Sequence, residues 1–173
     1  MPTVRHATPA DAVLLAAVAR RTFFDAYSGD DSSADLPIHM DRHFGVPQQA
    51  AELADPATTT LIIEDDDGTA IGYTLLGEDP VPECVTGPAP LQIRRFYVDQ
   101  ACKGKGVAQQ LMAAVDVEAR RRGRETIWLL AWYRNFRAHA FYRKCGFIQV
   151  GIAPYLFGST MEQDVAMARP TAP

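Results

Sequence analysis

The order of hydrophobic periods along the chain constrains its fold more than any other feature. The apolar runs 60–63 and 70–76 flank Asp65-Asp66-Asp67-Gly68, a sequence that favours a tight hairpin turn. Later strand-like runs alternate with helical patterns and cover residues 91–98, 126–132 and 147–153. Strands that first form a hairpin and then alternate with helices predict an α/β fold, in which a mixed sheet carries helices on both faces.

The rest of the chain supplies further elements around this centre. Residues 4–6 are a candidate first strand and residues 164–168 a candidate last one. Thr8-Pro9-Ala10-Asp11 is typical of a helix start, and the helix that follows carries an apolar stripe that includes Val13 and Ala17. Because 173 residues suffice for one hydrophobic core and hardly for two, we expect a single domain over residues 1–173.

Composition excludes several classes of function. A net charge of −4 gives no basic footprint of the kind that nucleic-acid-binding proteins show. No apolar run is long enough for a membrane span, and no signal-peptide pattern opens the chain. The three cysteines form no CxxC pair, which indicates reduced thiols. We therefore expect a cytoplasmic protein that binds neither nucleic acid nor a membrane.

A glycine-containing motif links the strand-like run 91–98 to the following helix, and it reads Lys103-Gly104-Lys105-Gly106-Val107-Ala108. Glycine lets backbone amides approach a bound anion, and the first helical turn offers unpaired N–H groups with partial positive charge. The two lysines add full charges. The motif predicts a pyrophosphate site, although a solvated strand-to-helix turn that binds nothing would look the same.

Two common nucleotide-binding loops do not fit this motif. The chain contains no GxxxxGK[ST] string, which a Walker loop requires. A Rossmann loop follows the first strand of its unit and precedes an acidic residue at the tip of a later strand. Here Glu118 and Glu125 lie within or just after the helix. The context therefore favours a different pyrophosphate-bearing cofactor.

Downstream segments complete a recognisable pattern. The segments are Arg95-Phe96-Tyr97-Val98, the glycine motif, Asn135, and Phe141-Tyr142-Arg143-Lys144-Cys145-Gly146-Phe147. Together they resemble the GNAT superfamily of N-acetyltransferases over roughly residues 91–150, with the N-terminal helices and hairpin in compatible order. The resemblance implies a mostly antiparallel GNAT-like sheet, acetyl-CoA as co-substrate, and no metal.

The resemblance also assigns roles to individual residues. It implies that backbone groups of Phe96, Tyr97 and Val98 bind the pantetheine arm. It implies that Asn135 contacts the cofactor and that Tyr142 contacts it as the general acid. The backbone amides expected to hold the pyrophosphate belong to Lys103, Gly104, Lys105, Gly106, Val107 and Ala108. Lys103 stands where the family usually has arginine or glutamine.

A narrower resemblance concerns the acceptor. The pattern IWL-x-x-W-x-x-N that ends at Asn135, together with Asp164 and Asp35-Leu36, resembles a branch that acetylates polyamines or diamines. We expect the acceptor side to be bounded by residues 25–44, 80–90 and 155–161. A narrow acidic cleft there would favour polyamines, whereas an open groove would favour a peptide.

The expected chemistry needs an acid and a base. A phenol with pKa about 10 can protonate a departing thiolate whose thiol has pKa about 8.5, if the phenol is well positioned. An alkylamine with pKa about 10.4 must lose a proton before it attacks. Gln92, Arg94 and Arg95 occupy the places where many relatives have a glutamate. Asp99 and Glu83 are nearby acids that nothing distinguishes, so the sequence assigns no base.

Other reactive side chains have simpler explanations. His39 and His43 are one helical turn apart, but zinc sites need a third ligand, and a solvated pair is expected. His139 is expected on a helix surface, and Cys102 and Cys145 lack an activating neighbour. The arginines of residues 120–124 complement the negative end of a helix.

Three functions compete at this point. The leading one is acetyl transfer from acetyl-CoA to a small primary amine, with a polyamine as a candidate. The second is acetylation of a protein N-terminus or lysine by the same chemistry. The third is a cofactor-binding sensor or scaffold that has lost catalysis. Exposed strand edges and apolar terminal segments also make a homodimer a candidate assembly.

Overall fold

A computed structural model describes the whole chain except residues 28 and 30–33. Over the described residues the strands form a seven-stranded sheet in the order β1-β2-β3-β4-β5-β7-β6. Neighbouring strands are antiparallel except for β4 and β5, which are parallel. The strands are β1 (Thr3–His6), β2 (Thr59–Glu64), β3 (Ala70–Gly77), β4 (Pro90–Val98), β5 (Thr126–Ala131), β6 (Ile148–Phe157) and β7 (Thr160–Pro170).

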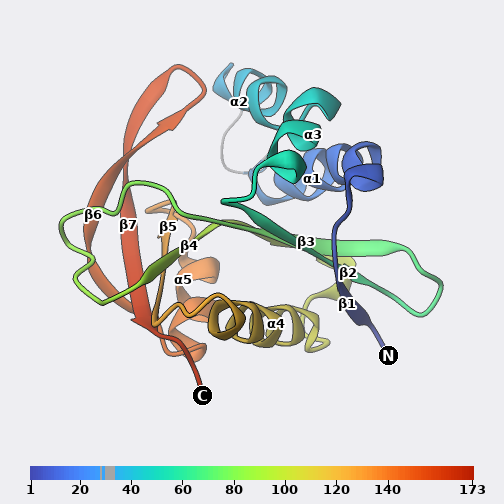
Figure 1. The fold of residues 1–173 in the computed structure, drawn as a ribbon. Helices are drawn as coiled ribbons and strands as arrows, with labels where there is room; N and C mark the ends of the chain where they lie inside the picture. The colour runs from blue at the N-terminus through green and yellow to red at the C-terminus, as the bar shows by residue number, and fades with distance from the viewer. Residues whose placement is uncertain (28, 30–33) are drawn as a thin grey trace.

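Helices cover both faces of the sheet, as Figure 1 shows, with α1, α2 and α3 on one face and α4 and α5 on the other. The helices are α1 (Ala12–Tyr27), α2 (Asp35–His43), α3 (Val46–Ala54), α4 (Val107–Arg121) and α5 (Phe136–Lys144). The mixed, mostly antiparallel α/β fold predicted from the sequence is therefore confirmed.

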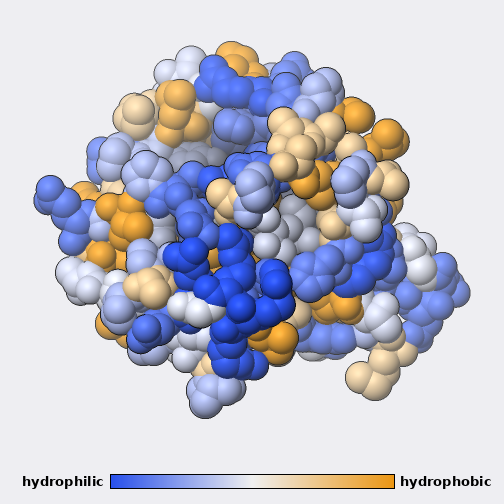
Figure 2. All heavy atoms as spheres, in the orientation of Figure 1, coloured by the Kyte–Doolittle hydropathy of each residue, from blue (hydrophilic) through white to orange (hydrophobic). Residues whose placement is uncertain are grey.

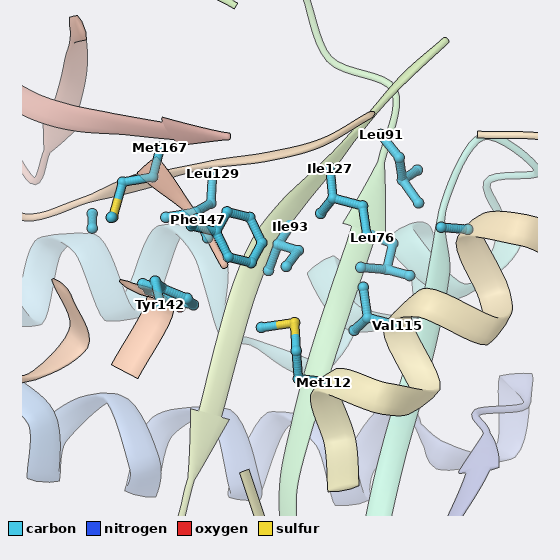
Figure 3. Close-up of a cluster of buried hydrophobic side chains, with 12 residues drawn as sticks. Leu76, Leu91, Ile93, Met112, Val115, Ile127, Leu129, Tyr142, Phe147 and Met167 are labelled. Carbon is cyan, nitrogen blue, oxygen red and sulfur yellow. The ribbon is translucent and has the colours of Figure 1, made fainter. Parts of the chain in front are cut away.

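The hydrophobic core on the α4 side lies under the middle of the sheet (Figure 3). Met112 and Val115 of α4 pack against Ile93 of β4 and Ile127 of β5, and these four side chains are at most 3% exposed. The apolar stripe of α4 is buried, because Leu111, Val115 and Ala119 are fully inaccessible. This core fixes α4, and with it the glycine loop, against β4.

The parallel pair β4 and β5 separates partway along its length. Register is kept from Pro90 opposite Thr126 to Ile93 opposite Leu129. Beyond these residues β4 continues to Val98 and pairs only with β3, while β5 pairs only with β7. One edge of β4 is consequently left without a strand partner, at the level where the glycine loop follows.

The arginines after α4 are engaged in ion pairs. Figure 2 shows a strongly hydrophilic surface over the C-terminal end of α4. Arg122 and Arg124 both pair with Glu78, and Arg121 pairs with Glu118. Arg120 donates a hydrogen bond to the carbonyl of Ala172. These contacts give the arginine run a structural role, and the absence of nucleic-acid binding stays a prediction.

Local patterns misplaced several side chains. Val13 was expected on the buried stripe of α1, but it is 68% exposed, and Leu15 and Phe23 are buried instead. His139 was expected on the surface, yet it is 5% exposed and its Nε2 lies 3.0 Å from the carbonyl oxygen of Trp132. The adjoining Phe136 is 74% exposed. In both helices the buried face is set by the position of the sheet and not by apolarity alone.

The exposed edge of the sheet and the composition of the helices bear on assembly and on membrane insertion. β6 is the terminal strand of the sheet formed by the described residues, and it carries the exposed side chains Ile148, Ile152 and Leu156. A homodimer stays a prediction. Among the described helices, none combines the length and apolarity needed to cross a membrane.

A buried ion pair ties α4 to the end of β7. Both guanidinium Nη atoms of Arg169 lie 2.8 Å from carboxylate oxygens of Asp116, and the amide of Ala172 donates to the same carboxylate. Arg169 and Asp116 are 7% and 8% exposed. The Arg169 guanidinium also lies 4.7 Å from the centre of the Phe147 ring.

We predict that Asp116→Ala lowers the free energy of unfolding by about 3–5 kcal/mol, because it leaves a buried guanidinium without its partner. Urea denaturation of the two proteins measures this difference. Asp67→Ala, in the exposed β2–β3 turn, is the matched control and should change stability by about 0.5 kcal/mol or less. Equal effects of the two substitutions would show that the ion pair does not hold α4 to β7.

Candidate active site

A cleft of about 730 Å³ opens where β4 and β5 separate. It is bounded by the end of α1, the outer part of β4, the glycine loop, the end of β5 and the start of α5. The predicted site residues that line it are Phe96, Tyr97, Val98, Lys103, Gly104, Gly106, Val107, Ala108, Asn135 and Tyr142. The exception is Lys105, which is exposed and does not line the cleft. Segments up to 46 residues apart thus meet at one place.

The glycine loop adopts a conformation that requires glycine. Gly104 and Gly106 have φ angles of 76° and 80°, and nothing lies within 4 Å of the position that a Cβ would take. Gly106 is the N-cap of α4, and no side chain caps it. The first helical bond runs from the amide of Gln110 to the carbonyl of Gly106. The preceding amides of α4 therefore have no helical acceptor.

The open edge of β4 presents backbone groups to the cleft. The amide of Asp99 donates to the carbonyl of Ile71 at 2.8 Å, and the carbonyl of Arg95 accepts a hydrogen bond from Thr74. Residues 95, 97 and 99 thus direct their backbone groups toward β3. Because these directions alternate along a strand, Phe96 and Val98 direct theirs into the cleft.

Positive side chains of the glycine loop and of the segment around Asn135 reach the cleft. Lys103, Arg134 and Arg137 line it. Partial burial, and then the neighbouring charge of Arg137, lowers the pKa of Lys103. The guanidinium of Arg134 lies 5.7 Å from the centre of the Trp132 ring. Sequence reasoning missed the two arginines, although both flank Asn135 within three residues.

Asn135 stands at the start of α5 and Tyr142 in its last turn. The Asn135 side chain accepts a hydrogen bond from the amide of Ala138 and so caps the helix. The same side chain also hydrogen-bonds with Tyr27. Tyr142 packs edge-on against Phe147 in the core and is 8% exposed. Burial raises the pKa of Tyr142, so its hydroxyl keeps its proton.

A smaller pocket of about 60 Å³ adjoins the cleft on the face of the sheet covered by α1. The two cavities share the wall residues Tyr27, Ile93, Arg94, Tyr97, Leu130 and Trp132. The other residues around the pocket are Phe23, Gln92, Tyr155, Phe157, Glu162 and Asp164. The pocket is therefore walled largely by aromatic rings and carries two carboxyl groups that sequence reasoning did not place together.

The expected boundaries of the acceptor side are correct only in part. Tyr27 and Tyr155 line the small pocket as predicted. No residue of 80–90 lines it, because Val85 packs against Trp128 farther along the sheet. Part of the predicted segment 25–44 lies outside the described residues.

The acids considered from the sequence are occupied or remote. Asp99 forms an ion pair with Arg21 at 2.9 Å, and neither Asp99 nor Glu83 lines the cleft or the pocket. Asp35 accepts hydrogen bonds from Ser159 and Thr160, and so holds the β6–β7 turn against α2. Asp35 therefore does not line the pocket, but it fixes the turn that connects the two strands of the pocket wall.

His39 of the histidine pair is buried, contrary to expectation, whereas His43 is partly exposed. His39 is 2% exposed, and its ring centre lies 4.5 Å from that of His43. Burial, and then His43, lowers the pKa of His39 to about 3. No group of three metal-binding side chains occurs within the described residues, and the absence of a metal stays a prediction.

Burial raises the pKa of the Cys145 thiol, which fits an unreactive cysteine.

Comparison with known structures and sequences matches this geometry. A crystal structure of the PaiA N-acetyltransferase from Thermoplasma acidophilum, in complex with coenzyme A, is similar in fold, with a TM-score of 0.78 and 17% identity. The match covers 98% of this chain and 99% of that one. An aminoglycoside N(6′)-acetyltransferase of Stenotrophomonas maltophilia is 29% identical and covers 84% of this chain and 86% of its own length.

A more similar sequence and a family match decide the classification. An uncharacterized N-acetyltransferase of Mycobacterium tuberculosis is 30% identical over 161 residues, which are 92% of this chain and 97% of the relative. The sequence model of the acetyltransferase (GNAT) family matches residues 20–147. The matched region contains the open edge of β4, the glycine loop and α5. The chain is an N-acetyltransferase and belongs to the GNAT family.

Proposed function

We propose that this enzyme transfers an acetyl group from acetyl-CoA to the primary amine of a small, positively charged molecule. The observation that carries the proposal is a pair of adjoining cavities with shared walls: a cleft bounded by the glycine loop and an open strand edge, and a small acidic and aromatic pocket. The name of the Stenotrophomonas relative, an aminoglycoside acetyltransferase, supports a small-molecule amine as acceptor.

The residues of the cleft fit acetyl-CoA. Pyrophosphate fits against the amides of the first turn of α4, because these donors lack partners within the helix, whereas the amides of Lys103 and Lys105 donate to the carbonyls of Gln100 and Cys102. The cationic groups of Lys103, Arg134 and Arg137 complement phosphate charge. The amide-bearing pantetheine arm fits along β4, where Phe96 and Val98 direct backbone donors and acceptors into the cleft. Asn135 borders the same arm.

Two groups of the chain act where charge develops. Acetyl-CoA supplies an activated acetyl thioester when bound. The Val98 amide, turned away from β3, is the donor we assign to the oxyanion. The Tyr142 hydroxyl makes no hydrogen bond to the described part of the chain, so it is available to the departing sulfur. Its raised pKa keeps it protonated before that step.

The pocket narrows the acceptor class. A volume of about 60 Å³ admits a slender amino group and not a folded surface. Six aromatic side chains around it offer faces to a cation, and two carboxyl groups add negative charge. A polyamine or diamine has this shape and charge. We therefore favour such an acceptor over a peptide.

We predict that Gly106→Glu weakens binding of coenzyme A at least about 10-fold, because a side chain and a negative charge enter the anion site at a positive φ. Isothermal titration calorimetry measures the change. Gly123→Glu is the matched control, since Gly123 also has a positive φ and open space but lies beyond the far end of α4. Equal affinities of the two variants would show that the loop does not hold the phosphates.

We predict that Tyr142→Phe lowers kcat about 100-fold with a diamine acceptor and leaves coenzyme A affinity within about 3-fold. A thiol-release assay over a panel of amines and peptides gives both the acceptor class and this effect. Tyr133→Phe, at an exposed position outside both cavities, is the control. Thiol release with peptides alone would favour protein acetylation. Cofactor binding without release for any acceptor would indicate a sensor.

A further inference from the structure

Asp164 is a buried acid of β7 that stands between the polar pair Glu162-Gln163 and the apolar run 165–168. It is 4% exposed, and its Oδ1 atom is fully buried with no hydrogen-bond partner among the described residues. In register it stands opposite Ala153 of β6, which offers no polar side chain. A buried carboxylate without a partner is costly, and folded chains seldom retain one unless it serves a ligand or a reaction.

The side chains around Asp164 create an environment suited to a cation. Tyr155 stands opposite Glu162 on the neighbouring strand, so both lie on the same side of the hairpin as Asp164. Tyr27 of α1, Tyr97 of β4 and Trp132 beyond β5 complete the wall. All these residues line the small pocket.

The balance of charge in the pocket is negative. Arg94 is the only cationic residue among those that line it, and its guanidinium is paired with Asp79. Asp164 and Glu162 therefore face the pocket with no cation of the described chain to neutralise Asp164. Burial, and then the charge of Glu162, raises the pKa of Asp164 to about 6. An acid of this kind is ionised at neutral pH but accepts a proton readily.

We propose that Asp164 is the catalytic base that removes a proton from the ammonium group of the acceptor. The inference rests on the proposed function, because it assumes a primary amine in the pocket. One N–H bond of the ammonium breaks and an O–H bond forms on the Asp164 carboxylate. The nitrogen keeps its electron pair, which becomes available for attack. The proton then leaves Asp164 for solvent.

The positions of Asp164 and Tyr142 are consistent with separate roles. Tyr142 belongs to the core on the α4 and α5 side of the sheet, whereas Asp164 lies in the pocket on the α1 side. The two cavities meet where β4 and β5 separate. The amine thus approaches from one face of the sheet and the departing sulfur is protonated from the other.

The central experiment is the pH dependence of kcat/KM for wild type and Asp164→Asn with a diamine acceptor. The kcat/KM of wild type should rise with pH through a pKa of about 6 and then stay level up to the amine pKa near 10. Asp164→Asn must capture the small uncharged fraction of the amine, so its kcat/KM should rise about 10-fold per pH unit across that range. At pH 7 the variant should be slower by about 100-fold or more.

Two controls separate proton transfer from a general loss of structure. With methoxyamine, which carries no charge at pH 7, Asp164→Asn should retain kcat/KM within about 3-fold, because no proton has to be removed first. Glu162→Gln should raise KM for the diamine while keeping the level region of the pH profile. An Asp164→Asn profile that matched wild type, or an equal loss with methoxyamine, would overturn the proposal.

Thermal stability gives a readout that does not depend on catalysis. Because the Asp164 pKa is higher in the folded chain than in the unfolded one, the ionised group opposes folding above pH about 6 and no longer does so below about 4. Asp164→Asn should therefore have a higher Tm than wild type at pH 8, and the gain should shrink at pH 4. A lower Tm at pH 8 would contradict an unpartnered carboxylate.

The same assays distinguish the two proposals. A wild-type enzyme that released no thiol with any amine would overturn amine acetylation and the role of Asp164 with it. An active wild-type enzyme with an unaffected Asp164→Asn variant would leave amine acetylation standing and remove only the base.

Discussion

The separation of β4 from β5 beyond Ile93 and Leu129 is the constraint on which the rest of the structure depends. Backbone donors and acceptors that lose a strand partner need another partner, and a ligand with amide groups can supply it. Aromatic pairs border the gap on both faces of the sheet. The ring centres of Tyr27 of α1 and Trp132 are 5.6 Å apart, and so are those of Phe141 of α5 and Phe96. The opening between β4 and β5 is therefore part of the sheet itself.

The charged residues of the two cavities favour different positions for an anionic and a cationic substrate. The neighbouring cations Lys103 and Arg137 line the cleft at the glycine loop, and Glu162 and Asp164 line the small pocket. A phosphate-bearing molecule and an ammonium-bearing molecule are thus drawn to different cavities. Between them the wall is aromatic and aliphatic, which suits an uncharged thioester. With this layout, a protein of net charge −4 still offers cations to the proposed anionic cofactor.

Local sequence signals were sufficient for the elements and for half of the candidate site. Gly106 and Asn135 could be placed because a positive φ and a helix cap depend on adjacent residues only. Asp164 could not be recognised as a candidate base, since its isolation depends on Ala153 and on the α1 residues that close the pocket. His139 was misplaced for the same reason: the Trp132 carbonyl that it meets is brought near by a turn. Long-range packing decides such positions.

The division of the acid and the base between two faces of the sheet follows from their different requirements. As the proposed acid, Tyr142 must hold its proton until the sulfur departs, and burial beside Phe147 raises its pKa accordingly. Asp164 must be ionised before the amine arrives, which a fully closed core would prevent. Asp164 is 4% exposed, a burial that raises its pKa to about 6, and the pocket that it lines adjoins the larger cleft. The strand gap is what allows the two environments to meet at one reacting centre.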